Sequence, residues 1–574
     1  MSGTARRLLA LALLGAASLL LFDLLKSGDR WWPAEVVTGE PTPGAPGAKD
    51  GVRPGIAADA SRPGNAVLSP ESNLPESGLG KSAPSAVELW PPPGSPSSGR
   101  TIERNALDGR IAALLDRDNL KSAVAAIVIG SVEDGGLMYE RFADRPLIVA
   151  SNAKLLTSAA ALTWLGPEYR FETEVLAGSS IDSSGLMKGD LFVKGAGDPD
   201  LMDDHRPAKK HLLPRLVALI RDSGLRRATG RLVIDDHVFD REYVPSTWRK
   251  TELKSPYNAP VAGFSLYENC VTLHVRPGEA AGLPARVALV GQAGVFQVLS
   301  RVKTVASGPV QLSVAGPRAD EPVNPGPLTV RGTIPLNVAL YRLVAPVRDP
   351  VMVAGRLLKQ ALLQAGIVIE GEVVLAEQAI DSDGRVLRLG AVSTPLIDAL
   401  IEMNKDSSNV TAEHLYKLCG WVHSGQGSFA AGGRAELAVL ERLGIDTMGA
   451  HSADGSGISR ENRYTARQIQ ALLSRLYRGP LRDPLLRSLP EAGVDGTLRT
   501  RLSDAAYRGR LRAKTGWIER VSSLSGYCQT RSGEVLAFAM LFNGYTGRNQ
   551  QVKAIQDAIV ELLIDLSPEP EQDQ

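Results

Sequence analysis

Two residues near position 150 have the types and spacing needed to attack a carbonyl carbon. Ser151 and Lys154 lie in a stretch, 150–165, whose apolar spacing predicts a helix. Residues three apart share a face of a helix, so the lysine amine could take the proton of the serine hydroxyl. N–H groups at the helix N-terminus could stabilise a developing oxyanion. The spacing recurs at Ser300 and Lys303, but in a strand-like run where the two side chains would face opposite sides, and we interpret that copy as chance.

Two further motifs supply polar groups that could act with this pair. Ser407-Ser408-Asn409 is the only S-x-N of the chain, and we expect it in a loop between helices at 395–403 and 412–422. Lys514-Thr515-Gly516 is the only K-T-G and ends a strand-like run at 510–514. An edge strand with these residue types can bind a carboxylate and align an extended peptide. Taken singly, either motif also fits a turn or a helix cap.

The order of the three motifs resembles the S-x-x-K, S-D-N and K-T-G set of penicillin-binding proteins and class A β-lactamases. Ser408 stands where that set has aspartate. Over 101–566 the sequence resembles the class C low-molecular-mass penicillin-binding proteins, the D-alanyl-D-alanine carboxypeptidase/endopeptidase family. In that family a large insertion separates the first two motifs. Here the separation from Ser151 to Ser407 is 256 residues (407 − 151), far longer than in β-lactamases. Four further stretches carry the resemblance: 191–199, 454–460, 493–498 and 524–527.

The resemblance implies a role for each motif residue. Ser151 would be the acylated nucleophile and Lys154 its general base, kept neutral with the help of Lys514. Ser407 would relay a proton to the leaving amine, and Asn409 would hydrogen-bond Lys154 and the substrate amide.

The third motif would bind the substrate. Lys514, Thr515 and Gly516 would hold the terminal carboxylate and the extended peptide. Backbone N–H groups of Ser151 and Trp517 would form the oxyanion hole. Trp517 stands where many relatives carry a small hydroxyl residue, so its indole would reshape the substrate pocket.

Composition excludes several other classes of protein. The 574 residues include 64 Lys+Arg and 63 Asp+Glu, and a net charge of +1 argues against a nucleic-acid partner. Three cysteines and seven histidines form no metal-binding motif, so we expect no metal and no cofactor. The chain has no G-x-S-x-G sequence, which disfavours an α/β-hydrolase esterase.

Arg6 and Arg7 precede an apolar run from Leu8 to Phe22, which predicts an export signal that is either cleaved or kept as a membrane anchor. We therefore expect the protein in the periplasm or on the outer face of the cytoplasmic membrane. Pro, Gly and Ser dominate the stretch from Pro33 to Arg100, which predicts a disordered linker.

The globular part is predicted to be α/β (α+β), with a penicillin-binding-protein/β-lactamase-like transpeptidase domain split by a β-rich two-domain insertion. The expected segments are a signal at 1–32, a linker at 33–100, the first part of the transpeptidase-like domain at 101–172, the insertion at 173–385, the second part at 386–566 and a tail at 567–574.

The resemblance implies a serine-type D-Ala-D-Ala carboxypeptidase, a D-alanyl-D-alanine endopeptidase, or both. The partners would be peptidoglycan stem peptides, with β-lactams as covalent inhibitors. Two alternatives stay open from the sequence: a non-catalytic peptidoglycan-binding protein that keeps the fold, and a β-lactamase.

Overall fold

The computed structural model describes residues 106–133, 135–200, 211–251, 253, 255–290, 295–315, 328–380 and 386–566. They all belong to one compact unit, Lys81–Gln574. The expected signal segment, linker and tail lie outside these residues. Among the residues that are described, no helix is long and apolar enough to cross a membrane.

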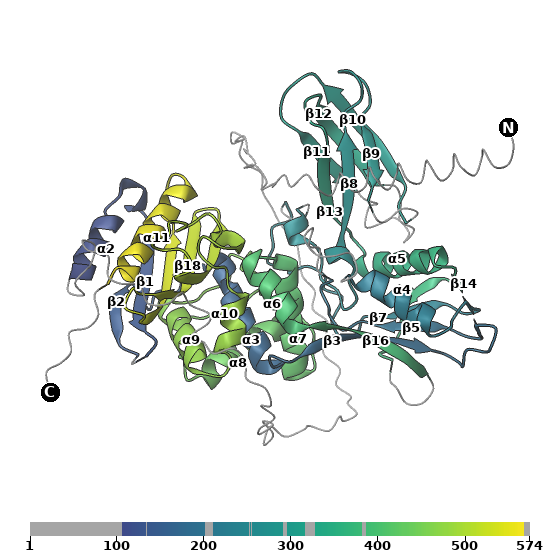
Figure 1. Ribbon diagram of the computed structural model, residues 1–574, viewed down its shortest axis with the longest axis horizontal. Coiled ribbons are helices and arrows are strands. Elements are labelled where there is room, and N and C mark those ends of the chain that lie inside the picture. Colours follow the sequence, from purple (N-terminus) through teal and green to yellow (C-terminus); the bar gives the residue numbers. More distant parts are fainter. Residues whose placement is uncertain are drawn as a thin grey trace, which may run out of the picture. The chain divides into compact units, whose positions relative to one another are not determined.

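A five-stranded antiparallel sheet joins the two ends of the described chain (Figure 1). Its strands in order are β17 (Leu511–Ile518), β18 (Val521–Gln529), β19 (Val535–Asn543), β1 (Val124–Ser131) and β2 (Leu137–Arg141). The apolar run in β1 pairs along its whole length with β19. Strand β17 is at the edge of the sheet, and the start of its outer side pairs with Glu491 through an isolated bridge at Arg512.

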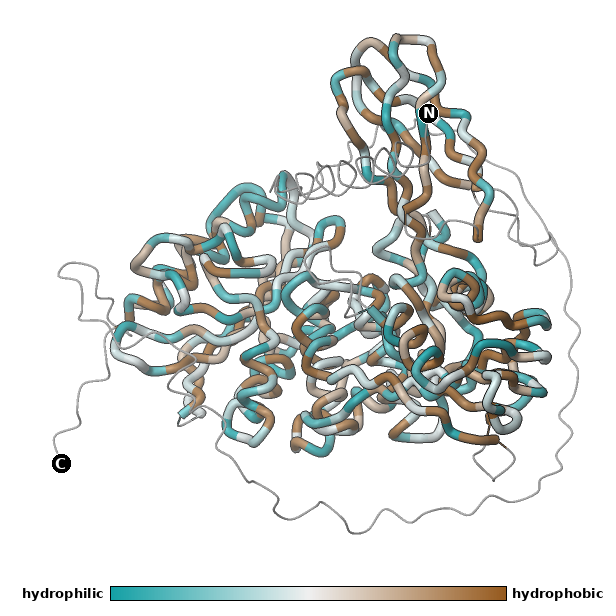
Figure 2. The backbone as a smooth tube through the Cα atoms, turned by 45° about the vertical axis from the view of Figure 1, so that its right-hand side comes forward, coloured by the Kyte–Doolittle hydropathy of each residue, from teal (hydrophilic) through white to brown (hydrophobic). Residues whose placement is uncertain are grey.

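Helices cover both faces of this sheet, which is why β18 and β19 are buried almost throughout. One face packs against α2 (Leu107–Leu115) and α11 (Asn549–Ile564). The other face packs against α3 (Ala153–Trp164), α9 (Ala466–Arg478) and their neighbours α6 (Leu396–Lys405), α7 (Asn409–Ser424), α8 (Phe429–Arg442) and α10 (Arg482–Ser488). Brown and teal segments alternate along many of these helices, as expected when one side of a helix is buried (Figure 2).

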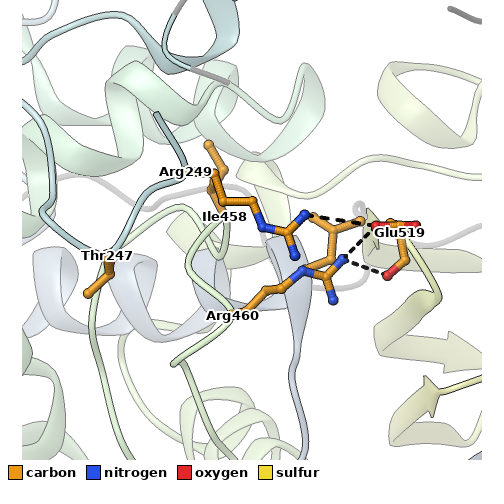
Figure 3. A pocket seen from close by; sticks show the side chains of 6 residues that line it. Thr247, Arg249, Ile458, Arg460 and Glu519 are labelled. Atoms are coloured by element: carbon orange, nitrogen blue, oxygen red, sulfur yellow. Dashed lines mark hydrogen bonds and ion pairs between the residues drawn. The ribbon is translucent and has the colours of Figure 1, made fainter. Parts of the chain in front are cut away.

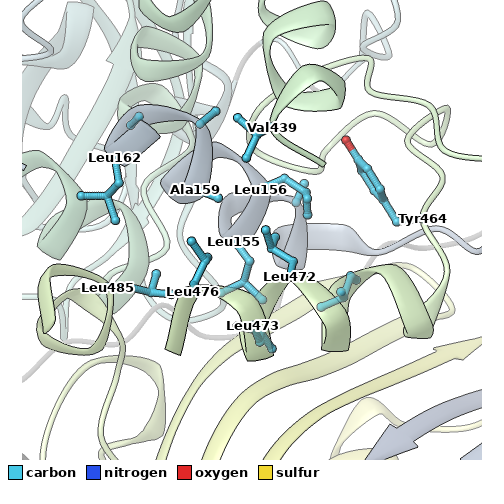
Figure 4. Packing of buried hydrophobic residues seen from close by; sticks show 14 of the residues in the cluster. Leu155, Leu156, Ala159, Leu162, Val439, Tyr464, Leu472, Leu473, Leu476 and Leu485 are labelled. Atoms are coloured by element: carbon cyan, nitrogen blue, oxygen red, sulfur yellow. The ribbon is translucent and has the colours of Figure 1, made fainter. Parts of the chain in front are cut away.

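Helix α3 is the centre of the larger core (Figure 4). Ten of its twelve residues are buried, and the sequence is rich in alanine and leucine, which favour helix and pack closely. Leu155, Leu156 and Leu162 lie against Leu472 and Leu485 of the surrounding helices. This packing fixes the start of α3, where Ser151 and Lys154 lie.

The inserted segment leaves through β3 (Arg170–Ala177) and returns through β16 (Leu387–Pro395), which pair with each other. They belong to a second five-stranded sheet with β5 (Leu191–Lys194), β7 (Leu232–Asp235) and β15 (Val373–Leu375), packed by α4 (Leu212–Asp222) and α5 (Pro350–Gln364). The expected boundaries at 172 and 386 therefore cut this sheet, because β3 and all of β16 lie within it. Helix α4 was not anticipated in a segment expected to be β-rich.

The remaining strands form three small sheets. The strands β4 (Leu186–Met187), β6 (Arg227–Ala228) and β14 (Val368–Ile369) make one of them. The others are β13–β8–β9 (Tyr341–Pro346, Cys270–Arg276, Arg286–Leu289) and β10–β12–β11 (Val298–Val305, Leu328–Pro335, Gln311–Ala315). The last two enclose a separate apolar cluster that includes Leu273, Val302 and Val330. The chance copy at Ser300 and Lys303 lies on β10, in this part of the insertion.

Candidate active site

A short 3-10 turn, Ala150–Asn152, places Ser151 between α3 and the sheet edge. Ala150 has a φ of 46°, in the left-handed region that non-glycine residues seldom adopt. The turn is tied to the sheet by Asn152, whose Nδ2 donates to Lys514 O (2.8 Å) and whose Oδ1 accepts from Ser525 Oγ (2.6 Å). Ser523 Oγ adds a bond to Val149 O (2.7 Å). Strands β17 and β18 therefore both hold the turn at the edge of the sheet.

Lys154 is fully buried and makes three hydrogen bonds through its amine. Lys154 Nζ lies 3.2 Å from Ser151 Oγ, 2.7 Å from Asn409 Oδ1 and 2.7 Å from the backbone oxygen of Ser456. Asn409 Oδ1 and Ser456 O can only accept, so they take two N–H bonds. A neutral amine would then direct its lone pair toward the Ser151 hydroxyl, which is the arrangement a general base needs.

Burial is the main reason that the pKa of Lys154 lies below the ordinary value, because a charged amine is poorly solvated there. The nearby carboxylates of Glu413 and Asp454 oppose that shift. Lys514 was expected to keep Lys154 neutral, but burial accounts for the shift. The pKa of Lys514 itself lies well below its usual range, through burial first and the Lys154 charge second.

Ser407 and Lys514 form a second pair beside the first. Lys514 Nζ donates to Ser407 Oγ (2.9 Å) and to Thr515 O (2.9 Å). Ser407 has a φ of 59°, a second left-handed residue at the site. Since the lysine donates to Ser407 Oγ, the hydroxyl hydrogen of Ser407 is left to point elsewhere.

The S-x-N motif lies at a helix start and not wholly in a loop. Asn409 is the first residue of α7, and Ser408 caps that helix by accepting a hydrogen bond from Thr411 N (3.2 Å). The residue that replaces the motif's aspartate thus has a structural partner, while Asn409 extends toward Lys154.

Gly516 lets β17 approach the nucleophile closely. A Cβ at this position would lie 2.9 Å from Ser151 N, closer than side chains tolerate. Thr515 Oγ1 donates to Thr497 Oγ1 (2.8 Å), a hydroxyl from the turn Gly496–Leu498 that the motifs did not indicate. The Trp517 side chain is 58% exposed, and its Nε1 donates to Tyr545 OH (3.1 Å), so the indole lies outside the cluster around Lys154.

The structure therefore brings together Ser151 and Lys154, from the 3-10 turn and the start of α3, Ser407 and Asn409, from the turn between α6 and α7 and the start of α7, and Lys514 from β17. Several residues of the site carry no motif signal, namely Asn152, Glu413, Ser456, Thr497, Ser523 and Ser525. The stretches 454–460, 493–498 and 524–527 each contain one of these residues, namely Ser456, Thr497 and Ser525, and their resemblance to the family was the only signal available.

The loop that carries Ser456 is shaped by Asp454. Its carboxylate accepts hydrogen bonds from Gly457 N (2.7 Å) and Ser459 N (2.6 Å). It also accepts one from Trp248 Nε1 (2.7 Å), a residue of the inserted segment. Asn462 Nδ2 also donates to it (2.7 Å). This Asp-Gly-Ser-Gly sequence therefore forms a turn, and the turn presents the Ser456 carbonyl to Lys154.

A hollow of about 100 Å³ opens beside this loop and the end of β17 (Figure 3). It is lined by Thr247, Arg249, Ile458, Arg460, Ile518 and Glu519. Arg460 Nη2 donates to Glu519 O (2.8 Å), and both arginines lie within 4 Å of the Glu519 carboxylate. The hollow therefore carries two positive charges and one negative charge next to Ser456 and Trp517.

Residues 107–566 match the D-Ala-D-Ala carboxypeptidase 3 (S13) family. A D-alanyl-D-alanine carboxypeptidase of Actinomadura sp. (strain R39) is 34% identical over 460 residues, covering 78% of this chain and 82% of that protein. The D-alanyl-D-alanine carboxypeptidase DacB of Haemophilus influenzae is 27% identical over 421 residues, covering 72% and 84%. The crystal structure of penicillin binding protein 4 from Haemophilus influenzae superposes with a TM-score of 0.69 at 25% identity, covering 79% of this chain and 99% of that one. The predicted fold class and family resemblance are confirmed.

Proposed function

Because this chain belongs to the D-Ala-D-Ala carboxypeptidase 3 (S13) family, we propose that its serine-type reaction is carried out by the cluster around Ser151 and Lys154. The protein is a D-Ala-D-Ala carboxypeptidase. The observation that carries the residue assignment is the set of three hydrogen bonds at Lys154 Nζ, two to oxygens that can only accept and one to Ser151 Oγ.

In the first half of the reaction, Ser151 Oγ bonds to the carbonyl carbon of the penultimate D-alanine, and its proton passes to Lys154 Nζ. The oxyanion would accept hydrogen bonds from Ser151 N and Trp517 N, a pairing supported by the close approach of Gly516 to Ser151 N. Thr515 and Lys514 would hold the terminal carboxylate.

The C–N bond then breaks and the terminal D-alanine leaves as an amine. Ser407 would relay to this amine the proton that Lys154 took up: it would give its own hydroxyl hydrogen to the leaving nitrogen and be reprotonated through Lys514 Nζ, which donates to Ser407 Oγ. Asn409 would hold both Lys154 and the substrate amide. Water hydrolyses the ester on Ser151 and restores the serine hydroxyl.

The substrates would be peptidoglycan stem peptides, at their D-alanyl-D-alanine end, at a D-alanyl cross-link, or both. β-Lactams would acylate Ser151 and leave a long-lived ester, in contrast to a β-lactamase. The export signal expected at 1–32 would bring the enzyme to this polymer, in the periplasm or on the outer face of the cytoplasmic membrane.

Labelling with a fluorescent penicillin tests the assignment, with wild type and Ser151→Ala compared side by side. We expect labelling of wild type, none of the variant, and release of D-alanine from a pentapeptide stem by wild type only. Cross-linked muropeptides in a parallel reaction measure the endopeptidase activity. A labelled Ser151→Ala variant would refute the nucleophile, and rapid turnover of the penicillin would favour a β-lactamase.

A further inference from the structure

Glu413 is a fully buried carboxylate next to the proposed base, and none of the three motifs includes it. It lies one helical turn after Asn409 on α7, on the same side of that helix. One carboxylate oxygen accepts from Ser456 N (2.9 Å) and the other from Gly455 N (2.9 Å). Both oxygens are therefore engaged by the loop that reaches Lys154.

Ser456 connects the carboxylate to the amine through a single residue. Its N–H is held by Glu413, while its carbonyl accepts the hydrogen bond from Lys154 Nζ at 2.7 Å. If the loop shifted, Lys154 would lose one of the two acceptors that orient its amine, and the third direction would no longer face Ser151. The orientation of the Lys154 amine toward Ser151 Oγ therefore depends on Glu413.

The charge of Glu413 acts on the same amine. It raises the pKa of Lys154, against the effect of burial. Burial first and the Asp454 charge second raise the pKa of Glu413 to about 8, while hydrogen bonds from the Ser456 hydroxyl and from the Gly455 and Ser456 N–H groups lower it. These donors favour the ionised carboxylate, against the effect of burial.

We propose that Glu413 is a positioning residue for the reaction: it holds the Gly455–Ser456 backbone so that the Ser456 carbonyl orients Lys154, and it places a negative charge near that amine. The inference rests on the proposed role of Lys154 as the base. Charged groups on the neighbouring elements act on this pair: Asp454 in the loop, Lys514 on β17 and Lys417 on α7. Asp406, before α7, acts on Lys514, and Glu436, on α8, acts on Asp454.

Two substitutions separate the placement from the charge. Glu413→Gln removes the charge and places the amide NH₂ group against the N–H of either Gly455 or Ser456, so that one of these donors loses its acceptor. We expect acylation by penicillin to slow by about 10- to 100-fold. In a plot of the acylation rate against pH, the acid limb should move to lower pH, because Lys154 loses a neighbour that favours its protonated form. Glu413→Asp keeps the charge but is one methylene too short to reach both N–H groups, so acylation should slow while the acid limb stays nearer its wild-type position.

Glu436→Gln is the matched control. Glu436 is equally buried on the adjacent helix, but its carboxylate accepts from the hydroxyls of Thr157, Ser452 and Tyr464, which can rotate to suit an amide. This variant loses the same charge in the same core, while the N–H groups of Gly455 and Ser456 keep their Glu413 partner. We expect its acylation rate and acid limb to stay within about twofold and a few tenths of a pH unit of wild type.

A second readout does not depend on activity. The Lys154 amine can be titrated by carbon-13 NMR in protein labelled at the lysine side chain, with its signal assigned by its absence in Lys154→Met. Glu413→Gln should lower the midpoint of that titration, and Glu436→Gln should not. Failure of wild type to acylate or to release D-alanine would refute the proposed function. The NMR titration of Lys154 would still test whether the charge of Glu413 acts on that amine.

A folded Glu413→Gln variant with wild-type acylation and an unmoved Lys154 titration would overturn the proposal. Thermal melting identifies a variant that does not fold, and in that case Glu413→Asp decides, since wild-type acylation by that variant would equally overturn it.

Discussion

Replacing Gly516 by alanine tests how closely β17 must approach the nucleophile. A Cβ at this position would lie 2.9 Å from Ser151 N and 3.1 Å from Val149 O, whereas ordinary contact begins near 3.4 Å. It would also lie 2.2 Å from Ser523 Oγ, which is engaged with Val149 O. The strand and the turn must therefore separate by about 0.5 Å (3.4 − 2.9) to accept the methyl group.

The size of the effect follows from that displacement. Overpacking a tightly packed contact costs roughly 1–3 kcal/mol of stability. A misplacement of about 1 Å at reacting groups lowers rates by about 100-fold, so a shift half as large should lower acylation by about tenfold. Because the oxyanion would be bound between Ser151 N and Trp517 N, the loss should fall on the acylation step.

The assay is the second-order rate constant for acylation by a fluorescent penicillin, measured beside the midpoint of thermal unfolding. Gly109→Ala is the control, because a Cβ at that position in α2 meets nothing within 4 Å. It should leave acylation unchanged and add up to about 1 kcal/mol of helix stability. A Gly516→Ala variant that acylates within twofold of wild type would show that β17 does not have to lie so close.

Three further predictions concern the turn and the buried lysine. Asn152→Ala leaves Lys514 O and Ser525 Oγ without their buried partner, so the free energy of unfolding should fall by about 2–4 kcal/mol in urea titrations; an unchanged midpoint would count against the tie between turn and sheet. Acylation should rise with pH as Lys154 loses its proton, with a midpoint below 10.5 because burial lowers the pKa of Lys154. For the same reason Lys154→Met should melt at a higher temperature than wild type, most clearly at pH values below the folded-state pKa of Lys154, and the advantage should vanish as the pH approaches the ordinary lysine value. Melting curves at several pH values check this sign.

The sequence allowed the motif residues and most elements around them to be predicted. The helix expected at 150–165 and the strand-like run expected at 510–514 correspond to α3 and to the start of β17 within a few residues. Helix α3 could be recognised because nearly all of it is buried, which gives a long apolar run bounded by turn residues.

Other parts of the site could not be read from spacing. Glu413 and Ser456 lie near Lys154 through contacts between segments far apart in the chain. Ser456 acts through its backbone carbonyl, which any residue would supply, so its side-chain type gave no signal. The start of α7 was placed too late, because Asn409 and Val410 begin the helix under the Ser408 cap and leave little apolar periodicity to indicate it. The pairing of β16 with β3 also joins segments far apart in the chain, so the sequence pattern of either strand did not show which sheet it belongs to.

The pairing of β1 with β19 has a consequence for how this enzyme matures. Val124 pairs with Asn543 and Ser131 with Leu536, so this ladder joins segments about 400 residues apart. Contacts at such separation form slowly, because a long loop must close before they stabilise anything. Ser151 and Lys154 emerge early in synthesis, but the strand that presents Lys514 needs β18 and β19 as neighbours. A chain that has been synthesised only in part should therefore bind no penicillin, and labelling should report complete synthesis and folding to at least residue 543.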